Sequence, residues 1–178
     1  MNRGMRYVLW SVIGLLALAW PGSAFAEPCL SPYVKRLVGP EKYLYVLSVD
    51  ADAKDNDFLA VIDVNLASAT YGLLLTTVDL GSANNEPHHM GFTDDRTKIW
   101  AGTLFSKRLF IIDVATDPAK PKIVKTIEDI TALTGLHGPH TYYALPGRML
   151  LTFLSSADGN PPGGLAEFQD RAGLTTPT

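Results

Sequence analysis

A segment of about fifty residues occurs twice in the chain, and this repeat restricts the fold more than any other feature of the sequence. "FLAVIDV" matches "RLFIIDV", with Val64 falling on Val114. Further along, "PHHMGFTDDRTKIWAG" matches "PHTYYALPGRMLLTF", with His88 falling on His140. "GGLAEF", near the end of the chain, is expected to start a third copy. Repeats of this period are typical of propellers, solenoids and other arrays.

Within each copy the pattern is that of short β-strands separated by turns. Runs rich in β-branched and aromatic residues alternate with clusters of Gly, Pro, Asn and Asp. Residues 128–135 are expected to form one helical turn that Gly135 terminates. The predicted strands are 42–49, 58–64, 73–80, 98–104, 108–114, 122–127 and 148–154, with others at "HHMGFT", "HTYYAL" and "GLAEFQD".

Four short strands in about fifty residues is the size of one propeller blade. We therefore expect an all-β fold, a partial β-propeller of about two to three blades, each a four-stranded antiparallel sheet. An ordinary small β-sandwich with coincidental internal similarity is the alternative. Because propellers have about four to eight blades, residues 57–178 are expected to be the truncated N-terminal part of one. Residues 27–56 are then a lead-in segment and first strand.

The first residues have the three parts of a secretory signal peptide. "MNRGMR" carries Arg3 and Arg6, an apolar run of fourteen residues follows, and small residues precede a cleavage point after Ala26. The apolar run is shorter than the roughly 20 residues that a membrane span needs, and an uncleaved anchor is the alternative. We expect residues 1–26 to be removed, leaving a periplasmic chain with no stable membrane anchor.

The charge of the mature chain argues against nucleic acid as a partner. The formal net charge is −3 at pH 7, and removal of Arg3 and Arg6 makes it −5. Phosphate binding requires clustered Lys and Arg, and lysines concentrate only in "PAKPKIVK", which we interpret as a solvated loop and strand face. Cys29 is the single cysteine, so no internal disulfide can form. A homo-oligomer is left open.

The four histidines are the candidate metal ligands, and they lie in two short stretches. They are His88, His89, His137 and His140. The repeat places His88 and His140 at equivalent positions, each after a proline, so their imidazoles are expected to converge near a propeller axis. Neutral imidazole binds copper, zinc, iron and nickel. The alternative is that these histidines are hydrogen-bonded loop residues.

The adjacent pair poses a geometric problem, because neighbouring residues of a regular strand point to opposite faces. Either a twist after Pro87 turns both His88 and His89 inward, or one of them binds and the other supports it.

The other polar residues are weaker candidates for a functional site. Asp63 and Asp113 repeat within "IDV" and are expected to bond backbone groups in turns. No nucleophile-elbow or phosphate-loop motif is present.

Four pieces of the sequence together resemble the selenium-binding protein family, whose bacterial enzymes are methanethiol oxidases. The pieces are "EPHHMGF", "RLFIIDVATDPAKPKIVKTIE", "LHGPHT" and "NPPGG". The resemblance implies a propeller-like fold, a periplasmic location in bacteria and copper bound by histidines. His88 and His89 match the family's double His, and His137 and His140 match its H-x-x-H. The stretch after the double His contains no cysteine, so selenium binding is not expected.

The reaction implied by this resemblance is that of an oxidoreductase that acts on a small thiol with O2. Methanethiol, O2 and water would give formaldehyde, hydrogen sulfide and hydrogen peroxide. His88, His89 and His140 would hold the copper, and His137 would be a further ligand or a proton carrier. No catalytic residue is assigned beyond these ligands. The alternatives are a non-catalytic exported module that binds metal or a protein, and an inactive remnant of the enzyme.

Overall fold

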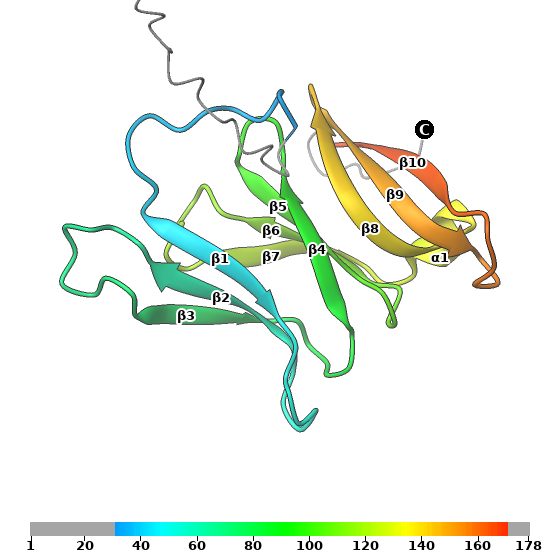
Figure 1. Ribbon diagram of the computed structural model, residues 1–178, viewed down its shortest axis with the longest axis horizontal. Coiled ribbons are helices and arrows are strands. Elements are labelled where there is room, and N and C mark those ends of the chain that lie inside the picture. The colour runs from blue at the N-terminus through cyan, green and yellow to red at the C-terminus, as the bar shows by residue number, and fades with distance from the viewer. Residues whose placement is uncertain (1–30, 171–178) are drawn as a thin grey trace, which may run out of the picture.

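Three antiparallel β-sheets and one short helix make up the computed structural model, which describes residues 31–170 (Figure 1). The predicted signal peptide and Cys29 lie outside the described residues. The elements are β1 (Tyr43–Ser48), β2 (Phe58–Asp63), β3 (Leu74–Asp79), β4 (Pro87–Phe92), β5 (Lys98–Thr103), β6 (Leu109–Asp113), β7 (Lys122–Ile127), α1 (Ile130–Thr134), β8 (Leu136–Leu145), β9 (Arg148–Ser156) and β10 (Gly164–Gln169).

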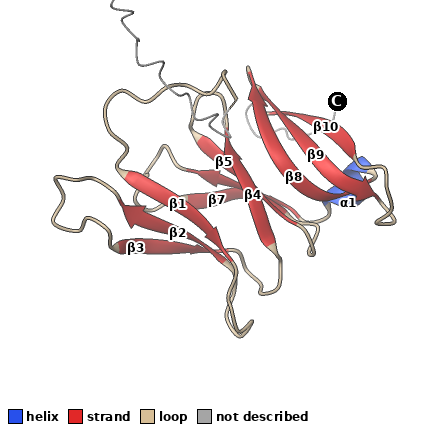
Figure 2. Ribbon diagram, in the orientation of Figure 1, coloured by secondary structure: helices blue, strands red, loops and turns tan. Residues whose placement is uncertain are grey.

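Each sheet is a meander in which consecutive strands pair. The orders are β1-β2-β3, β4-β5-β6-β7 and β8-β9-β10. The all-β prediction is confirmed, as Figure 2 shows. The prediction of four strands in every sheet is wrong for residues 31–170, where only the middle sheet has four. The segment "GGLAEF", expected to start a third copy, forms β10, which is the third strand of its meander just as "RLFIIDV" forms β6, the third strand of the middle sheet.

The middle sheet is buried on both faces, which explains why its central strands read as nearly continuous apolar runs. Neighbouring side chains of β5 point to opposite faces, so Ile99 packs toward the first sheet and Trp100 toward the third. The core on the first side contains Leu59, Leu80, Ile99, Ala101, Phe110, Ile112 and Val114. The core on the other side contains Val34, Trp100, Leu109, Ile111, Ile130, Tyr142, Ala144, Met149, Leu151, Phe153 and Phe168.

The edge strands β1, β4 and β8 bring the three sheets together. Each lies at the edge of its own sheet, and β4 contacts both of the others (Figure 1). Residues near the start of β4 and of β8 can therefore approach one another although they belong to different sheets.

The predicted helical turn is confirmed as α1. Asp129 caps its start by accepting a hydrogen bond from the backbone N–H of Ala132, and Gly135 ends it with φ of 71°. β8 begins at the next residue, Leu136, so the end of the helix sets where the second histidine stretch starts. Within residues 31–170, α1 is the only helix, and it is far shorter than a membrane crossing requires.

The repeated Asp of "IDV" organises the turn after the strand in both copies. Asp63 accepts hydrogen bonds from the backbone N–H of Asn65 at 2.8 Å and from Thr70 Oγ1 at 2.6 Å. Asp113 accepts from the backbone N–H of Ala115 at 2.8 Å. The expectation that these carboxylates bond backbone groups in turns is confirmed.

Candidate metal centre

β4 begins with an irregularity that sets two consecutive histidines against one residue of β5. The pairing register shifts between Pro87 and Met90, so that His88 and His89 together lie opposite Gly102. A β-bulge of this kind increases the local twist and redirects a side chain. It supplies the departure from regular strand geometry that two adjacent imidazoles need to share one site.

β8 carries the same irregularity at the equivalent position. Its register shifts between Pro139 and Tyr142, so that His140 and Thr141 lie opposite Thr152. In both strands the bulge comes directly after a proline, which has no N–H to donate to the ladder. The sequence repeat therefore encodes a repeated backbone feature, and a histidine is the first residue of each bulge.

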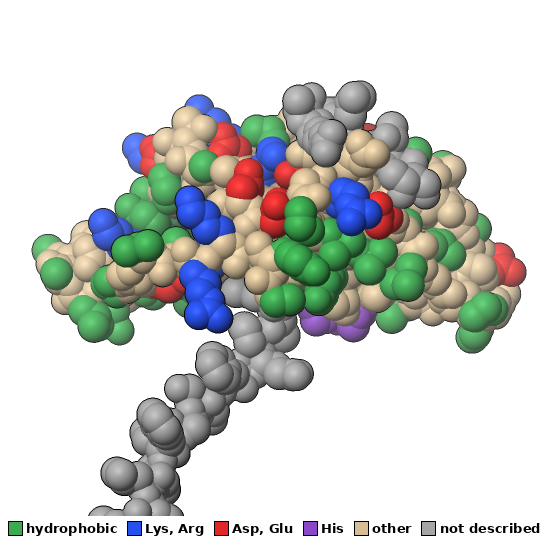
Figure 3. Space-filling model, turned by 90° about the horizontal axis from the view of Figure 1, so that it is seen from above, with side chains coloured by type: hydrophobic (Ala, Val, Ile, Leu, Met, Phe, Trp, Pro, Cys, Tyr) green, Lys and Arg blue, Asp and Glu red, His purple; other side chains and the backbone are tan. Residues whose placement is uncertain are grey.

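The two bulges bring three imidazoles together. Each of His88, His89 and His140 offers a ring nitrogen, and these nitrogens all lie within 4.8 Å of one another. The ring centroids are 4.6 Å apart for His88 and His89, 5.1 Å for His88 and His140, and 4.3 Å for His89 and His140. Histidine side chains form a patch on the surface in Figure 3. His88 and His89 are exposed and His140 is half-buried.

The surroundings of His89 favour the neutral form that metal binding requires. Burial lowers the pKa of His89, and the neighbouring imidazoles of His140 and His88 lower it further. Nδ1 of His140 lies 3.1 Å from Thr141 Oγ1, which leaves Nε2 as its nitrogen for ligation. A neutral imidazole has a free lone pair, whereas a protonated one cannot bind an ion.

His137 is not part of this cluster. It is half-buried, and its Nδ1 lies 3.3 Å from Thr131 Oγ1. It lines an open cavity of about 260 Å³ with Leu104, Phe105 and Leu154 among other residues. The structure thus brings together three of the four predicted ligands, and the role of His137 stays a prediction.

The loop before β4 is held by a buried carboxylate that the sequence analysis did not identify. The backbone N–H and the Nδ2 of Asn85 both donate to Asp57 Oδ2, at 2.7 Å and 3.0 Å. Asp57 Oδ1 accepts from the backbone N–H of Asp50 at 2.9 Å. On either side of Asn85, Asn84 and Glu86 have φ of 56° and 52°. Such left-handed residues persist where surrounding contacts hold them.

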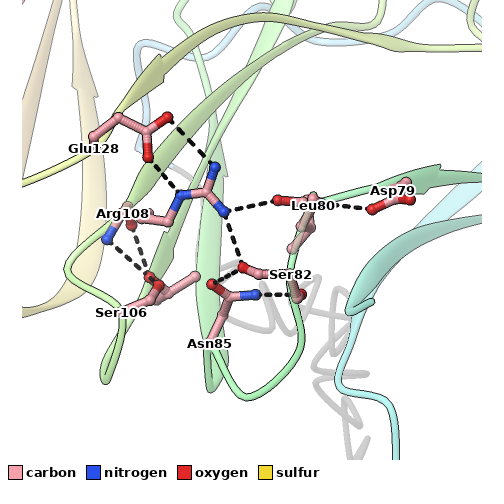
Figure 4. Close-up of polar contacts among 9 residues, drawn as sticks. Asp79, Leu80, Ser82, Asn85, Ser106, Arg108 and Glu128 are labelled. Atoms are coloured by element: carbon pink, nitrogen blue, oxygen red, sulfur yellow. Dashed lines mark hydrogen bonds and ion pairs between the residues drawn. The ribbon is translucent and has the colours of Figure 1, made fainter. Parts of the chain in front are cut away.

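A second set of contacts ties the same loop to the middle sheet (Figure 4). Nη1 of Arg108 donates to the carbonyl oxygen of Leu80 at 2.9 Å and to Ser82 Oγ at 3.0 Å. Its Nε pairs with a Glu128 carboxylate oxygen at 2.9 Å. Ser82 Oγ in turn donates to Asn85 Oδ1 at 3.0 Å. The segment that leads into the double His is therefore fixed from both the first and the middle sheet.

The donor set fits a transition-metal ion. All three candidate ligands are imidazoles, which suit copper, zinc, iron and nickel, whereas magnesium and calcium prefer oxygen. Two nitrogens bound to one ion at about 2.1 Å are at most about 4.2 Å apart. The 4.8 Å limit of the cluster is slightly larger than this, so we expect the rings to adjust when an ion binds.

Comparison with known proteins places this chain in a described family. The family profile "56kDa selenium binding protein (SBP56)" matches residues 27–174. A methanethiol oxidase from Ruegeria pomeroyi is 43% identical over 164 residues, which cover 88% of this chain and 37% of that protein. A methanethiol oxidase from Hyphomicrobium sp is 43% identical over 162 residues, with 88% and 36% covered.

A solved structure has the same fold over most of this chain. The X-ray structure of a hypothetical selenium-binding protein from Sulfolobus tokodaii matches with a TM-score of 0.71 and 29% identity. The match covers 79% of this chain and 34% of that one. The chain thus spans a little over one third of the length of the proteins that it matches.

Proposed function

This chain belongs to the 56 kDa selenium-binding protein family, and on that premise we propose that its histidine cluster is the copper-binding part of a methanethiol oxidase. The observation that carries the proposal is the convergence of His88, His89 and His140 within 4.8 Å. The two relatives at 43% identity, both named methanethiol oxidase, support the choice of reaction.

The proposed reaction converts methanethiol, O2 and water to formaldehyde, hydrogen sulfide and hydrogen peroxide. The carbon of methanethiol is oxidised by two electrons, O2 takes up those electrons to become peroxide, and the sulfur leaves as hydrogen sulfide. Copper, when bound, supplies a positive charge that favours the thiolate form of the substrate and a redox centre between thiol and O2.

The chain's own residues prepare the site for this chemistry. The paired bulges hold His88, His89 and His140 at short range before any ion arrives, so little ordering is needed on binding. His88 and His89 are exposed, which leaves the site open to a small thiol and to O2. We assign His137 the role of proton carrier, because Thr131 Oγ1 lies at its Nδ1 and leaves Nε2 for the thiol proton.

We propose further that the three sheets are blades of a β-propeller in an exported, periplasmic protein. Support for the propeller comes from the face-to-face packing of three meanders and the meeting of their edge strands β1, β4 and β8. Support for export comes from the sequence of residues 1–26. N-terminal sequencing of protein from the periplasmic fraction should begin at Glu27, and an intact Met1 in the cytoplasmic fraction would contradict export.

The proposal is tested with the purified chain loaded with one equivalent of copper. Methanethiol and O2 are added, and thiol loss, formaldehyde and hydrogen peroxide are measured against the metal-free chain and the same chain loaded with zinc. We expect the products only with copper. Tight copper binding without products would favour a non-catalytic binding module, and no stoichiometric copper binding would refute the site itself.

A further inference from the structure

The side chain of Tyr142 crosses from β8 onto two glycines of the middle sheet. A Cβ atom added to Gly91 in β4 would lie 2.6 Å from the Cβ of Tyr142. A Cβ added to Gly102 in β5 would overlap the Tyr142 Oη atom. Real Cβ atoms do not approach other atoms this closely at either position. The ring therefore occupies space that exists only because these two residues are glycines.

This contact joins the two bulges that carry the histidines. Gly102 is the residue opposite His88 and His89, and Tyr142 is the residue at which β8 regains its register after His140. Pro139, directly before His140, reaches the same glycine, with its Cγ 3.0 Å from the added Cβ. The Tyr142 ring is therefore packed between the supports of the three imidazoles.

The tyrosine acts here through its volume and not through a hydrogen bond. Its side chain is buried, and within residues 31–170 its Oη has no hydrogen-bond partner. β4 and β8 belong to different sheets. The distance between their histidines is consequently set by side-chain packing, which transmits even small changes in volume.

We propose that Tyr142 is a positioning residue of the histidine cluster, which sets the separation of His140 from His88 and His89 by packing against Gly91 and Gly102. The inference rests on the proposed metal site for its copper-based readout. Its geometric content, the spacing of the two bulges, holds for the metal-free chain as well.

The test uses a clash that a second substitution removes. Gly102→Ala places a methyl group on the Tyr142 hydroxyl, and Tyr142→Phe deletes that hydroxyl. Copper affinity, measured by competition with a chromophoric chelator, should fall about tenfold or more in Gly102→Ala, with a changed Cu(II) EPR spectrum. The double variant loses the clash with the hydroxyl but keeps the 3.0 Å approach of Pro139 Cγ, so it should recover most of the lost affinity and move back toward the wild-type spectrum. Tyr142→Phe alone should resemble wild type.

Gly91→Ala is the matched control, because it meets the Tyr142 Cβ, which phenylalanine retains. Tyr142→Phe should therefore not rescue it. A wild-type affinity and EPR spectrum in Gly102→Ala would overturn the inference, as would a folded double variant that binds copper no better than Gly102→Ala. If Gly102→Ala does not fold, Tyr142→Leu replaces it, and an unchanged EPR spectrum in that folded variant would overturn the inference equally.

A metal-free measurement separates this inference from the proposed function. In a Cys29→Ser background that carries His89→Cys and His140→Cys, the rate of disulfide formation under mild oxidant reports the spacing of the bulges. Gly102→Ala should slow this rate, and Tyr142→Phe should restore it. Failure of the wild-type chain to bind copper would refute the proposed function, and the disulfide rates would still decide the role of Tyr142.

Discussion

The imidazole rings of His89 and His140 have their centroids 4.3 Å apart, although β4 and β8 belong to different sheets. Each ring lies on a bulge that follows a proline. Convergence of this kind requires both bulges and the packing between the sheets, and it makes the cluster sensitive to changes in either strand.

Replacing one histidine from each bulge should abolish metal binding. His88→Ala/His140→Ala leaves a single imidazole, which cannot hold an ion at micromolar protein concentration against buffer. The measurement is copper per chain after gel filtration. His137→Ala is the control, since His137 lies outside the cluster, and it should retain one equivalent. One tightly held equivalent in the double variant would show that the ligands are elsewhere.

The stability of the metal-free chain should fall as the pH is lowered through about 6.5, the ordinary pKa of histidine. The pKa of folded His89 is lowered by burial and by its two neighbours. The unfolded chain thus binds more protons in this range, and acid favours unfolding. Above this range His89 is neutral in both states, so its titration does not change the free energy of unfolding. Urea unfolding at several pH values measures this free energy.

His89→Gln should reduce this pH dependence, because glutamine does not titrate. Copper should stabilise the wild-type chain near pH 7 and lose that effect in acid, because protons compete for the same nitrogens. An identical pH profile in wild type and His89→Gln would mean that folding does not lower the pKa of His89.

Asp57→Asn should destabilise the chain by about 1–3 kcal/mol, the range for leaving buried hydrogen-bonding groups poorly satisfied. Asp57 is fully buried and accepts hydrogen bonds from Asn85 and from the backbone of Asp50. Thermal and urea unfolding measure the loss. Asp55→Asn, two residues away on an exposed side chain, should stay within about 0.5 kcal/mol of wild type.

Copper affinity should fall in Asp57→Asn as well, because Asn85 is three residues before His88 and its loop is fixed by this carboxylate. An Asp57→Asn variant that is destabilised and still binds copper with wild-type affinity would show that the loop does not position the histidines.

Alkaline pH should weaken the contact between the first and middle sheets. Burial raises the pKa of Tyr45 to about 12, and its hydroxyl donates to the carbonyl oxygen of Pro118 at 2.8 Å. The folded chain keeps this proton to a higher pH than the unfolded chain, so stability falls as the pH rises above about 10. Tyr45→Phe should flatten this part of the profile of unfolding free energy against pH.

Sequence patterns were sufficient for the strands and for part of the site. Runs of apolar, β-branched and aromatic residues predicted the strands. The repeat alone placed His88 and His140 at equivalent positions. The period could not decide whether His89 joined them, because a bulge changes the register by one residue without any signal in hydropathy.

Contacts between distant segments were not accessible from the sequence. The carboxylate of Asp57 and the amide of Asn85 meet across two turns, and each residue alone is typical of a polar turn. The fit of Tyr142 onto Gly91 and Gly102 depends on how two sheets pack. Glycines inside strands can indicate such a close approach, but they do not say which side chain fills the space.

The two bulges place a constraint on the number of residues in each strand as well as on their identity. Deleting one residue between Pro87 and Met90 would let β4 pair with β5 without interruption. Such a deletion removes one of the two adjacent histidines and leaves the other alone opposite Gly102, so the three-imidazole cluster is lost. A lineage that lost a single codon here would thus keep almost the same sequence and lose the proposed ion site.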